Sequence, residues 1–191
     1  MIPDGLLRTL RKEDVRSISR RYFISNGFDG TLTAIGIAMG SFLSGVPSGL
    51  TVIKIGAGAA VGLGTSGVWS VWEIERAEKL AERQRLERAM LTDLGETRIE
   101  RLQRHARMVN AVMSGIGPII AIAVTIAPFA LEGILVTMRQ ATVLSVAAGT
   151  VVLFLFGAYM GNISNQRWTV AGIRMGLAGL VVALINIGLP G

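Results

Sequence analysis

The chain has no cysteine and only one histidine, His105. Without cysteine there is no disulfide bond, no thiolate metal site and no cysteine nucleophile. A single histidine argues against histidine-rich metal sites and against a Ser-His-Asp triad. Charged residues are scarce as well: they make up 17% of the 191 residues, whereas a typical soluble domain has about 25%. Phosphate-binding loops, dinucleotide fingerprints and hydrolase motifs are also missing, so we do not expect an enzyme.

The sequence contains long apolar stretches without charged residues. Residues 111–131 and 141–166 contain no Asp, Glu, Lys or Arg. About 20 apolar residues in a helix are enough to cross the hydrocarbon core of a bilayer. We therefore expect an all-α integral membrane protein with five transmembrane helices, at residues 22–45, 48–74, 109–131, 140–161 and 168–189.

The basic residues predict how these helices are oriented. The chain has 19 Lys and Arg residues, and all but Lys54 and Arg139 fall on one side of the five expected spans. Because cytoplasmic loops carry the excess of Lys and Arg, we expect a multi-pass cell-membrane protein with a cytoplasmic N-terminus and an external C-terminus. This asymmetry, together with attraction to anionic lipid headgroups, accounts for the basic character, so no nucleic-acid partner is needed. The expected organisation is a basic cytoplasmic arm (1–21), two transmembrane helices (22–74), a cytoplasmic helical hairpin (75–108) and three transmembrane helices (109–191).

The expected hairpin is rich in glutamate. We expect transmembrane helix two to continue into it as far as about Leu94, with a turn at Gly95. Within each of its two helices the glutamates share a face, and hard divalent cations prefer several carboxylate ligands. The candidate metal ligands of this region are Glu75, Glu78, Glu82, Glu96 and Glu100. The alternative is a solvated face, because mixed Glu/Arg helices commonly form ion pairs between neighbouring turns.

Asp29 is an acidic residue inside the first expected span, between Gly27 and Gly30. A carboxylate within a bilayer is costly, so it marks a functional site by default. The two glycines allow another backbone to approach the carboxylate closely. Asp29 is therefore a candidate to bind a cation or carry a proton. The alternative is a structural aspartate that caps a helix beginning near Phe28.

Several short motifs occur in an order that is typical of one family of membrane proteins. The segments 25–36, SNGFDGTLTAIG, and 72–78, WEIERAE, carry the first two. The first is similar to the first-helix Asp-Gly motif of the vacuolar iron transporter family, and the second resembles that family's transition from helix two into the cytoplasm. Similar matches follow in the third, fourth and fifth helices, at Gly117-Pro118, Pro128-Phe129, 156–161 and 174–179. The resemblance covers about residues 20–190 and is closest to short archaeal members.

The resemblance implies a five-helix fold and a homodimer with its pathway at the two-fold axis. It also implies export of Fe²⁺ or a similar divalent ion, such as Mn²⁺, from the cytosol in exchange for protons, with no permanently bound cofactor. Asp29 matches the first-helix aspartate of the translocation path, and the hairpin glutamates correspond loosely to a metal-collecting domain. The chain departs from the plant and fungal pattern at 65–70, TSGVWS, which lacks the methionine and the Gly-Glu-Tyr found there.

Two functions from different classes therefore remain after the sequence has been considered. The first is a divalent-metal transporter that uses Asp29 within the membrane and the hairpin glutamates outside it. The second is a dimeric membrane scaffold whose cytoplasmic Glu/Arg helices dock a partner protein. Binding of a divalent ion tighter than roughly millimolar distinguishes the first from the second.

Overall fold

The computed structural model describes the backbone of residues 13–90 and 98–188, and side chains over the same ranges except for residues 13, 14 and 98–103. In these ranges the chain forms long helices and no strand. The helices are α2 (Glu13–Leu43), α3 (Gly49–Met90), α4 (Arg98–Ile126), α5 (Met138–Ile163) and α6 (Trp168–Gly188), with a short 3-10 helix η1 (Ala127–Leu131) after α4. The expected all-helical class is confirmed for the described residues.

Four of the helical segments are long and apolar enough to cross a membrane: α3, α4 together with η1, α5 and α6. They correspond to the expected second to fifth spans. Helix α2 covers the expected first span but is not among the four, because Asn26, Asp29 and several glycines interrupt its apolar residues. Crossing of the membrane by α2 therefore stays a prediction. Helix α2 also begins at Glu13, so the last part of the basic arm is helical.

Local sequence explains where two of the helices change. Pro128 lies near the start of η1. Proline lacks the N–H that an α-helix needs and disfavours helical geometry in the residue before it, so α4 gives way to the 3-10 turn. Helix α5 starts with a capping box, in which the Thr137 side chain accepts from the Gln140 backbone and the Gln140 side chain accepts from the Thr137 backbone.

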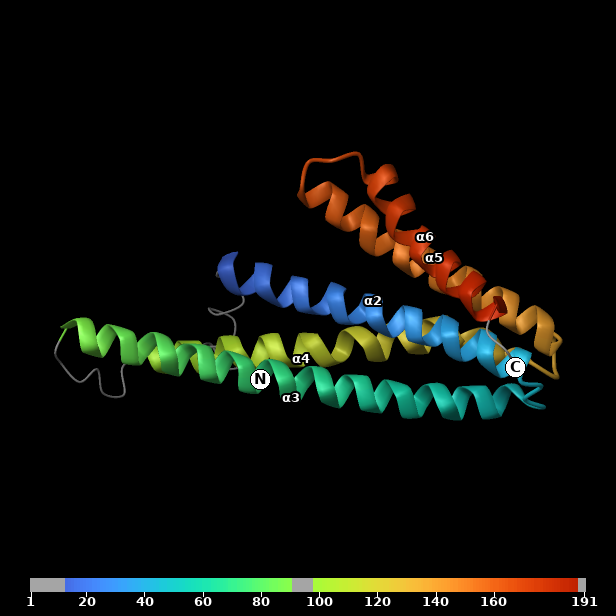
Figure 1. Ribbon diagram of the computed structural model, residues 1–191, viewed down its shortest axis with the longest axis horizontal. Helices are drawn as coiled ribbons and strands as arrows, with labels where there is room; N and C mark the ends of the chain where they lie inside the picture. Colours follow the sequence, from blue (N-terminus) through green and yellow to red (C-terminus); the bar gives the residue numbers. More distant parts are fainter. Residues whose placement is uncertain (1–12, 91–97, 189–191) are drawn as a thin grey trace.

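Helices α2, α3 and α4 run along the long axis of the molecule, with α4 packed against both of the others, while α5 and α6 form a hairpin that diverges from α2 (Figure 1). Helix α3 continues without a break to Met90, as expected. Helices α3 and α4 extend past the start of α2 (Figure 1). The turn that would join them into the expected hairpin, at Gly95, lies outside the described residues.

Glycine lets α2 and α4 approach closely. A Cβ atom added to Gly30 would lie 2.7 Å from Cα of Pro118, inside the distance that real Cβ atoms keep. A Cβ atom added to Gly40, on the same helix, would meet nothing within 4 Å.

We therefore expect Gly30→Ala to destabilise the fold by about 1–3 kcal/mol, because α4 would have to move. Gly176→Ala, on α6, is the matched control, because a Cβ atom there would come no closer than 3.6 Å to its neighbours. It should be neutral or stabilising by up to about 1 kcal/mol, because alanine is the better helix former. Thermal unfolding of the purified protein in detergent measures both. Equal melting temperatures for the two variants would contradict the close α2–α4 packing.

Candidate functional site

Asp29 lies in the middle of α2, sixteen residues after the helix begins at Glu13. It is therefore not a cap, and the alternative of a helix that starts near Phe28 is wrong. Its side chain is exposed on the outside of the bundle. No hydrogen bond or ion pair joins it to another residue in the part of the chain that the structure describes. A carboxylate in an apolar segment is thus left available for a ligand or for a second molecule.

The face of α2 that carries Asp29 is made of small and polar residues. Ser25 is exposed one turn before Asp29, and Gly36 and Gly40 follow it. Cβ atoms added to these two glycines would meet nothing within 4 Å. Most helical glycines of the described chain instead pack against a neighbouring helix, so this face is not used inside the monomer.

Helix α3 has a similar open face. Gly58 and Gly62 are exposed, and Cβ atoms added there would also meet nothing within 4 Å. Thr65 and Ser66, both exposed, follow one turn later. At 1.5 Å per residue, Asp29 is about 21 Å from the end of α2, and Gly62 is about 20 Å from the start of α3. Since the two helices are joined by a short turn, Asp29 and Gly62 lie at about the same depth.

Glu75 is a half-buried carboxylate at the point where α3 leaves its apolar part. Asn110 on α4 donates from Nδ2 to Glu75 Oε1 at 2.6 Å, and the Oγ of Ser19 on α2 donates to Asn110 Oδ1. These contacts join three helices. Burial raises the pKa of Glu75 above its ordinary value of 4.5, against the lowering effects of the Asn110 hydrogen bond and the nearby charge of Arg107. Glu75 thus has a structural role in this conformation.

We expect the raised pKa of Glu75 to make the stability of the protein depend on pH. The neutral form is favoured in the fold, so the stability that this group contributes is complete at acidic pH and is lost as the pH rises through the folded pKa. Glu75→Gln keeps an acceptor for Asn110 without the charge. The variant should match the wild type near pH 4 and melt at a higher temperature at pH 7. Glu73→Gln is the control, because Glu73 is exposed and is not among the groups that shift the pKa of Glu75. A Glu75→Gln variant that is less stable at pH 7 would contradict the reasoning.

The other two described glutamates of the candidate set, Glu78 and Glu82, are exposed. Lys79 Nζ lies 2.6 Å from Glu82 Oε2, and this ion pair lowers the pKa of Glu82. Pairs of this kind between neighbouring turns are what a solvated Glu/Arg helix predicts. Glu96 and the side chain of Glu100 lie outside the described residues. Within the described ranges, no three Asp, Glu or His side chains come together as metal ligands.

A second polar contact set was not anticipated from the sequence. Asn26, one turn before Asp29, donates to the Oγ of Ser114 on α4, and that hydroxyl donates to the Gly67 carbonyl of α3 at 3.0 Å. The signal for it was present, since Asn26 and Ser114 are polar residues in apolar runs. Their pairing depends on which helices are neighbours. This set fixes the register of the three helices at the depth of Asp29.

Arg107 on α4 lies near Glu75, at the end of the apolar part of α3. Its Cζ lies 4.9 Å from the centre of the Trp72 ring, a cation–π arrangement. Its Nε is buried and has no hydrogen-bond partner among the described atoms. The positive charge therefore stands between α3 and α4 near Glu75, where it partly offsets the cost of burying that carboxylate.

Comparison with known proteins agrees with this architecture. The VIT family model matches residues 70–190, which is more than half of the chain. An uncharacterized protein of the archaeon Methanocaldococcus jannaschii is 27% identical over 168 residues, covering 86% of this chain and 85% of the relative. No solved structure matches the chain. These findings confirm the resemblance drawn from the motifs: the chain belongs to the VIT family, and it is a multi-pass membrane protein of metal-ion transport.

Proposed function

We propose that this chain exports Fe²⁺ or Mn²⁺ from the cytosol in exchange for protons, and that it does so as a homodimer. The observation that supports this most strongly is Asp29. It is a mid-helix carboxylate with no partner in the described chain, on the outside of a membrane bundle. Charged side chains within a membrane almost always face a water-filled cavity or another protein segment. Something other than lipid tails must therefore cover this face.

A second copy of the chain is the cover that fits best. The open glycines Gly36, Gly40, Gly58 and Gly62 form small-xxx-small pairs on α2 and α3. In membranes, such faces let helix backbones of two molecules approach closely. A two-fold axis beside α2 would bring two Asp29 carboxylates toward one another. The paired carboxylates, with the hydroxyls of Ser25 nearby, make an oxygen-rich site between two monomers.

Proton exchange follows from the chemistry of a carboxylate in such a site. Two negative charges in a space of low dielectric constant repel each other, so each carboxylate needs a metal ion or a proton as a partner. Loading of a divalent ion displaces protons, and release of the ion allows protons to return. This alternation couples metal movement in one direction to proton movement in the other.

The direction of export rests on two features. The excess of Lys and Arg supports a cytoplasmic N-terminus and a cytoplasmic extension of α3, by which we mean the part of α3 after Trp72. The glutamates Glu75, Glu78 and Glu82 lie on or beside this extension, which projects past the start of α2 (Figure 1). Together with Glu96 and Glu100, they would raise the local concentration of cations at the cytoplasmic entrance. They would act as an attracting surface there, and the membrane step would occur at Asp29.

The scaffold alternative is favoured by a different observation. Leu80, Leu86 and Met90 are exposed on the extension of α3, and a docked partner protein would cover them. Isothermal titration calorimetry separates the two functions. A transporter should bind Mn²⁺ saturably and more tightly than roughly millimolar, and Asp29→Asn should weaken that binding. Undetectable binding of Mn²⁺, Co²⁺ and Zn²⁺ by folded protein would favour the scaffold.

A further inference from the structure

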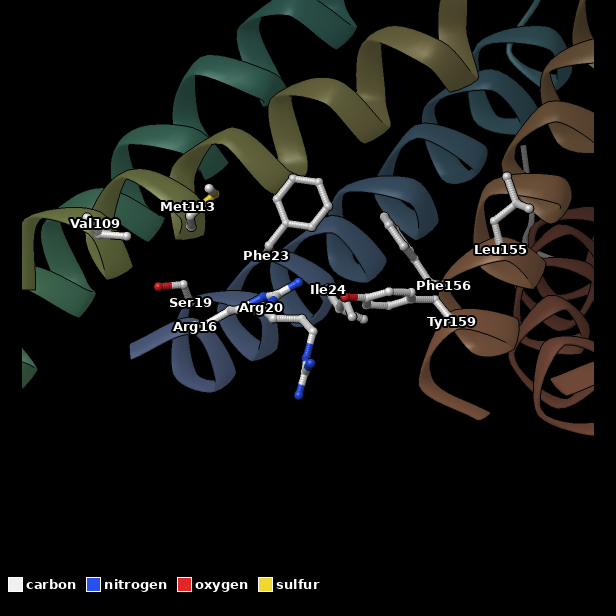
Figure 2. Close-up of a pocket in the computed structure, with 10 residues that line it drawn as sticks. All are labelled: Arg16, Ser19, Arg20, Phe23, Ile24, Val109, Met113, Leu155, Phe156 and Tyr159. Carbon is white, nitrogen blue, oxygen red and sulfur yellow. The ribbon is translucent and has the colours of Figure 1, made fainter. Parts of the chain in front are cut away.

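A groove of about 480 Å³ lies between α2, α4 and α5, away from the face that carries Asp29. Figure 2 shows the side chains that surround it. They come from the first turns of α2, the first apolar turns of α4 and the last turns of α5. The lining residues are Arg16, Ser19, Arg20, Phe23, Ile24, Val109, Met113, Leu155, Phe156 and Tyr159.

The groove exists because α5 diverges from α2. Phe156 packs on Gly27, where an added Cβ atom would lie 2.9 Å from the Phe156 ring, and the Phe23 and Phe156 rings meet edge to face at 6.1 Å. Beyond this contact the two helices separate toward the start of α2 (Figure 1). Aromatic rings therefore close the groove at its deeper end, and the groove is open at the end where α2 begins.

The lining changes in character along the groove. Phe23, Ile24 and Leu155 make the deeper part apolar, while Arg16 and Arg20 stand at the outer end on successive turns of α2. The Tyr159 ring extends from α5 toward α2 at this outer end (Figure 2). Neither arginine forms an ion pair with any residue that the structure describes. Two cationic groups thus stand at the outer end of an apolar groove, just before residue 22, where the first expected membrane span begins.

We propose that this groove is a binding site for an anionic phospholipid, with the phosphate held by Arg16 and Arg20 and one acyl chain lying along Phe23 and Leu155. Guanidinium groups bind phosphate with charge-assisted, bidentate hydrogen bonds. Basic residues next to a membrane helix favour anionic over zwitterionic lipids. The order of the groups, cationic outside and apolar inside, matches the order of headgroup and tail in a bilayer leaflet.

A second copy of the chain is a poorer occupant for this groove. A two-fold contact here would bring the Arg16 and Arg20 pairs of both copies together, and like charges repel. The open glycine faces of α2 and α3 offer a better contact elsewhere. The phospholipid needs no further partner, because it surrounds the chain in the membrane.

The test measures thermal unfolding of the full chain in detergent, with added phosphatidylglycerol or with phosphatidylcholine of the same acyl chains. We expect phosphatidylglycerol to raise the melting temperature by about 5 °C at saturation, and phosphatidylcholine to raise it by less than about 1 °C. The double variant Arg16→Gln/Arg20→Gln should lose this selectivity. Arg21→Gln is the matched control, since Arg21 is exposed on the same helix, lies over the ring of Tyr22 and does not line the groove.

Two further arms test the apolar part. Leu155→Trp, at a side chain 58% exposed, fills the groove without changing charge and should also remove the phosphatidylglycerol effect. Soluble glycerol phosphate lacks a tail and should not reproduce the effect. The proposal is overturned if both lipids stabilise equally, if Arg21→Gln is as impaired as the double variant, or if glycerol phosphate alone is sufficient. Native mass spectrometry of the same samples gives the bound lipid directly, so a variant that unfolds early is still tested.

Discussion

Replacing Asp29 with asparagine should reduce metal flux through the reconstituted protein by about 100-fold or more. The substitution keeps the shape of the side chain but removes the charge that holds a divalent ion, and each 1.4 kcal/mol of lost interaction costs about tenfold. Folding should be unaffected, because the side chain is exposed and has no partner within the described chain. Exposed substitutions of this kind usually change stability by no more than about 0.5 kcal/mol. Initial rates of Mn²⁺ entry into proteoliposomes measure the effect.

Ser25→Ala is the matched control for Asp29→Asn. Ser25 lies one turn earlier on the same exposed face of α2. Loss of its hydroxyl removes a neutral oxygen but no charge, so we expect flux within about threefold of the wild type, given about 0.5–1 kcal/mol for a neutral group. Normal flux through folded Asp29→Asn protein would remove Asp29 from the pathway and with it the proton-exchange mechanism.

Enlarging the open glycine face should separate the dimer. Gly36→Leu together with Gly62→Leu places two large side chains where Cβ atoms meet nothing within 4 Å in the monomer. The monomer should therefore keep its fold, while close helix approach between two copies becomes impossible. We expect a shift from dimer to monomer, measured by light scattering in detergent, with at least a tenfold weaker association, about 1.4 kcal/mol.

The matched control is Ala147→Leu, on the exposed side of α5 away from this face. It adds a similar volume to the surface and should leave the oligomeric state unchanged. In the glycine variant, the metal flux should decrease as the fraction of dimer decreases. In the control, the metal flux should stay normal. A glycine variant that remains dimeric would place the interface elsewhere, and a monomer with full flux would show that the site does not need two chains.

Much of the fold was predictable because the membrane imposes a simple rule on the sequence. Apolar runs of about 20 residues predicted the second to fifth spans. The dense helix formers after Val71 predicted that α3 continues well beyond its apolar part, as it does to Met90. The start of α2 at Glu13 was not predicted, since a basic segment carries no apolar signal for a helix. The capping box formed by Thr137 and Gln140 is a local sequence signal that determines where α5 begins.

The candidate site was less predictable, because its properties depend on which helices are neighbours. The sequence identified Asp29 because a carboxylate is costly within a membrane. Its exposure on a face that the monomer does not use became clear only from the packing of α2 on α4. Glu75 fitted the spacing of a metal ligand, yet its contact with Asn110, 35 residues away, gives it a structural partner. The groove between α2 and α5 depends on the angle between two helices, which no short motif encodes.

The most direct test of the central claim is metal flux into proteoliposomes that contain the folded wild-type protein. Fe²⁺, Mn²⁺, Co²⁺ and Zn²⁺ are offered in turn, with and without an imposed pH gradient, and internal metal and internal pH are followed together. We expect saturable entry of Fe²⁺ or Mn²⁺ that is faster when the inside of the liposomes is more acidic than the outside. Protons should leave the liposomes as the metal enters. Rates no higher than those of protein-free liposomes for all four metals, under both conditions, would contradict it.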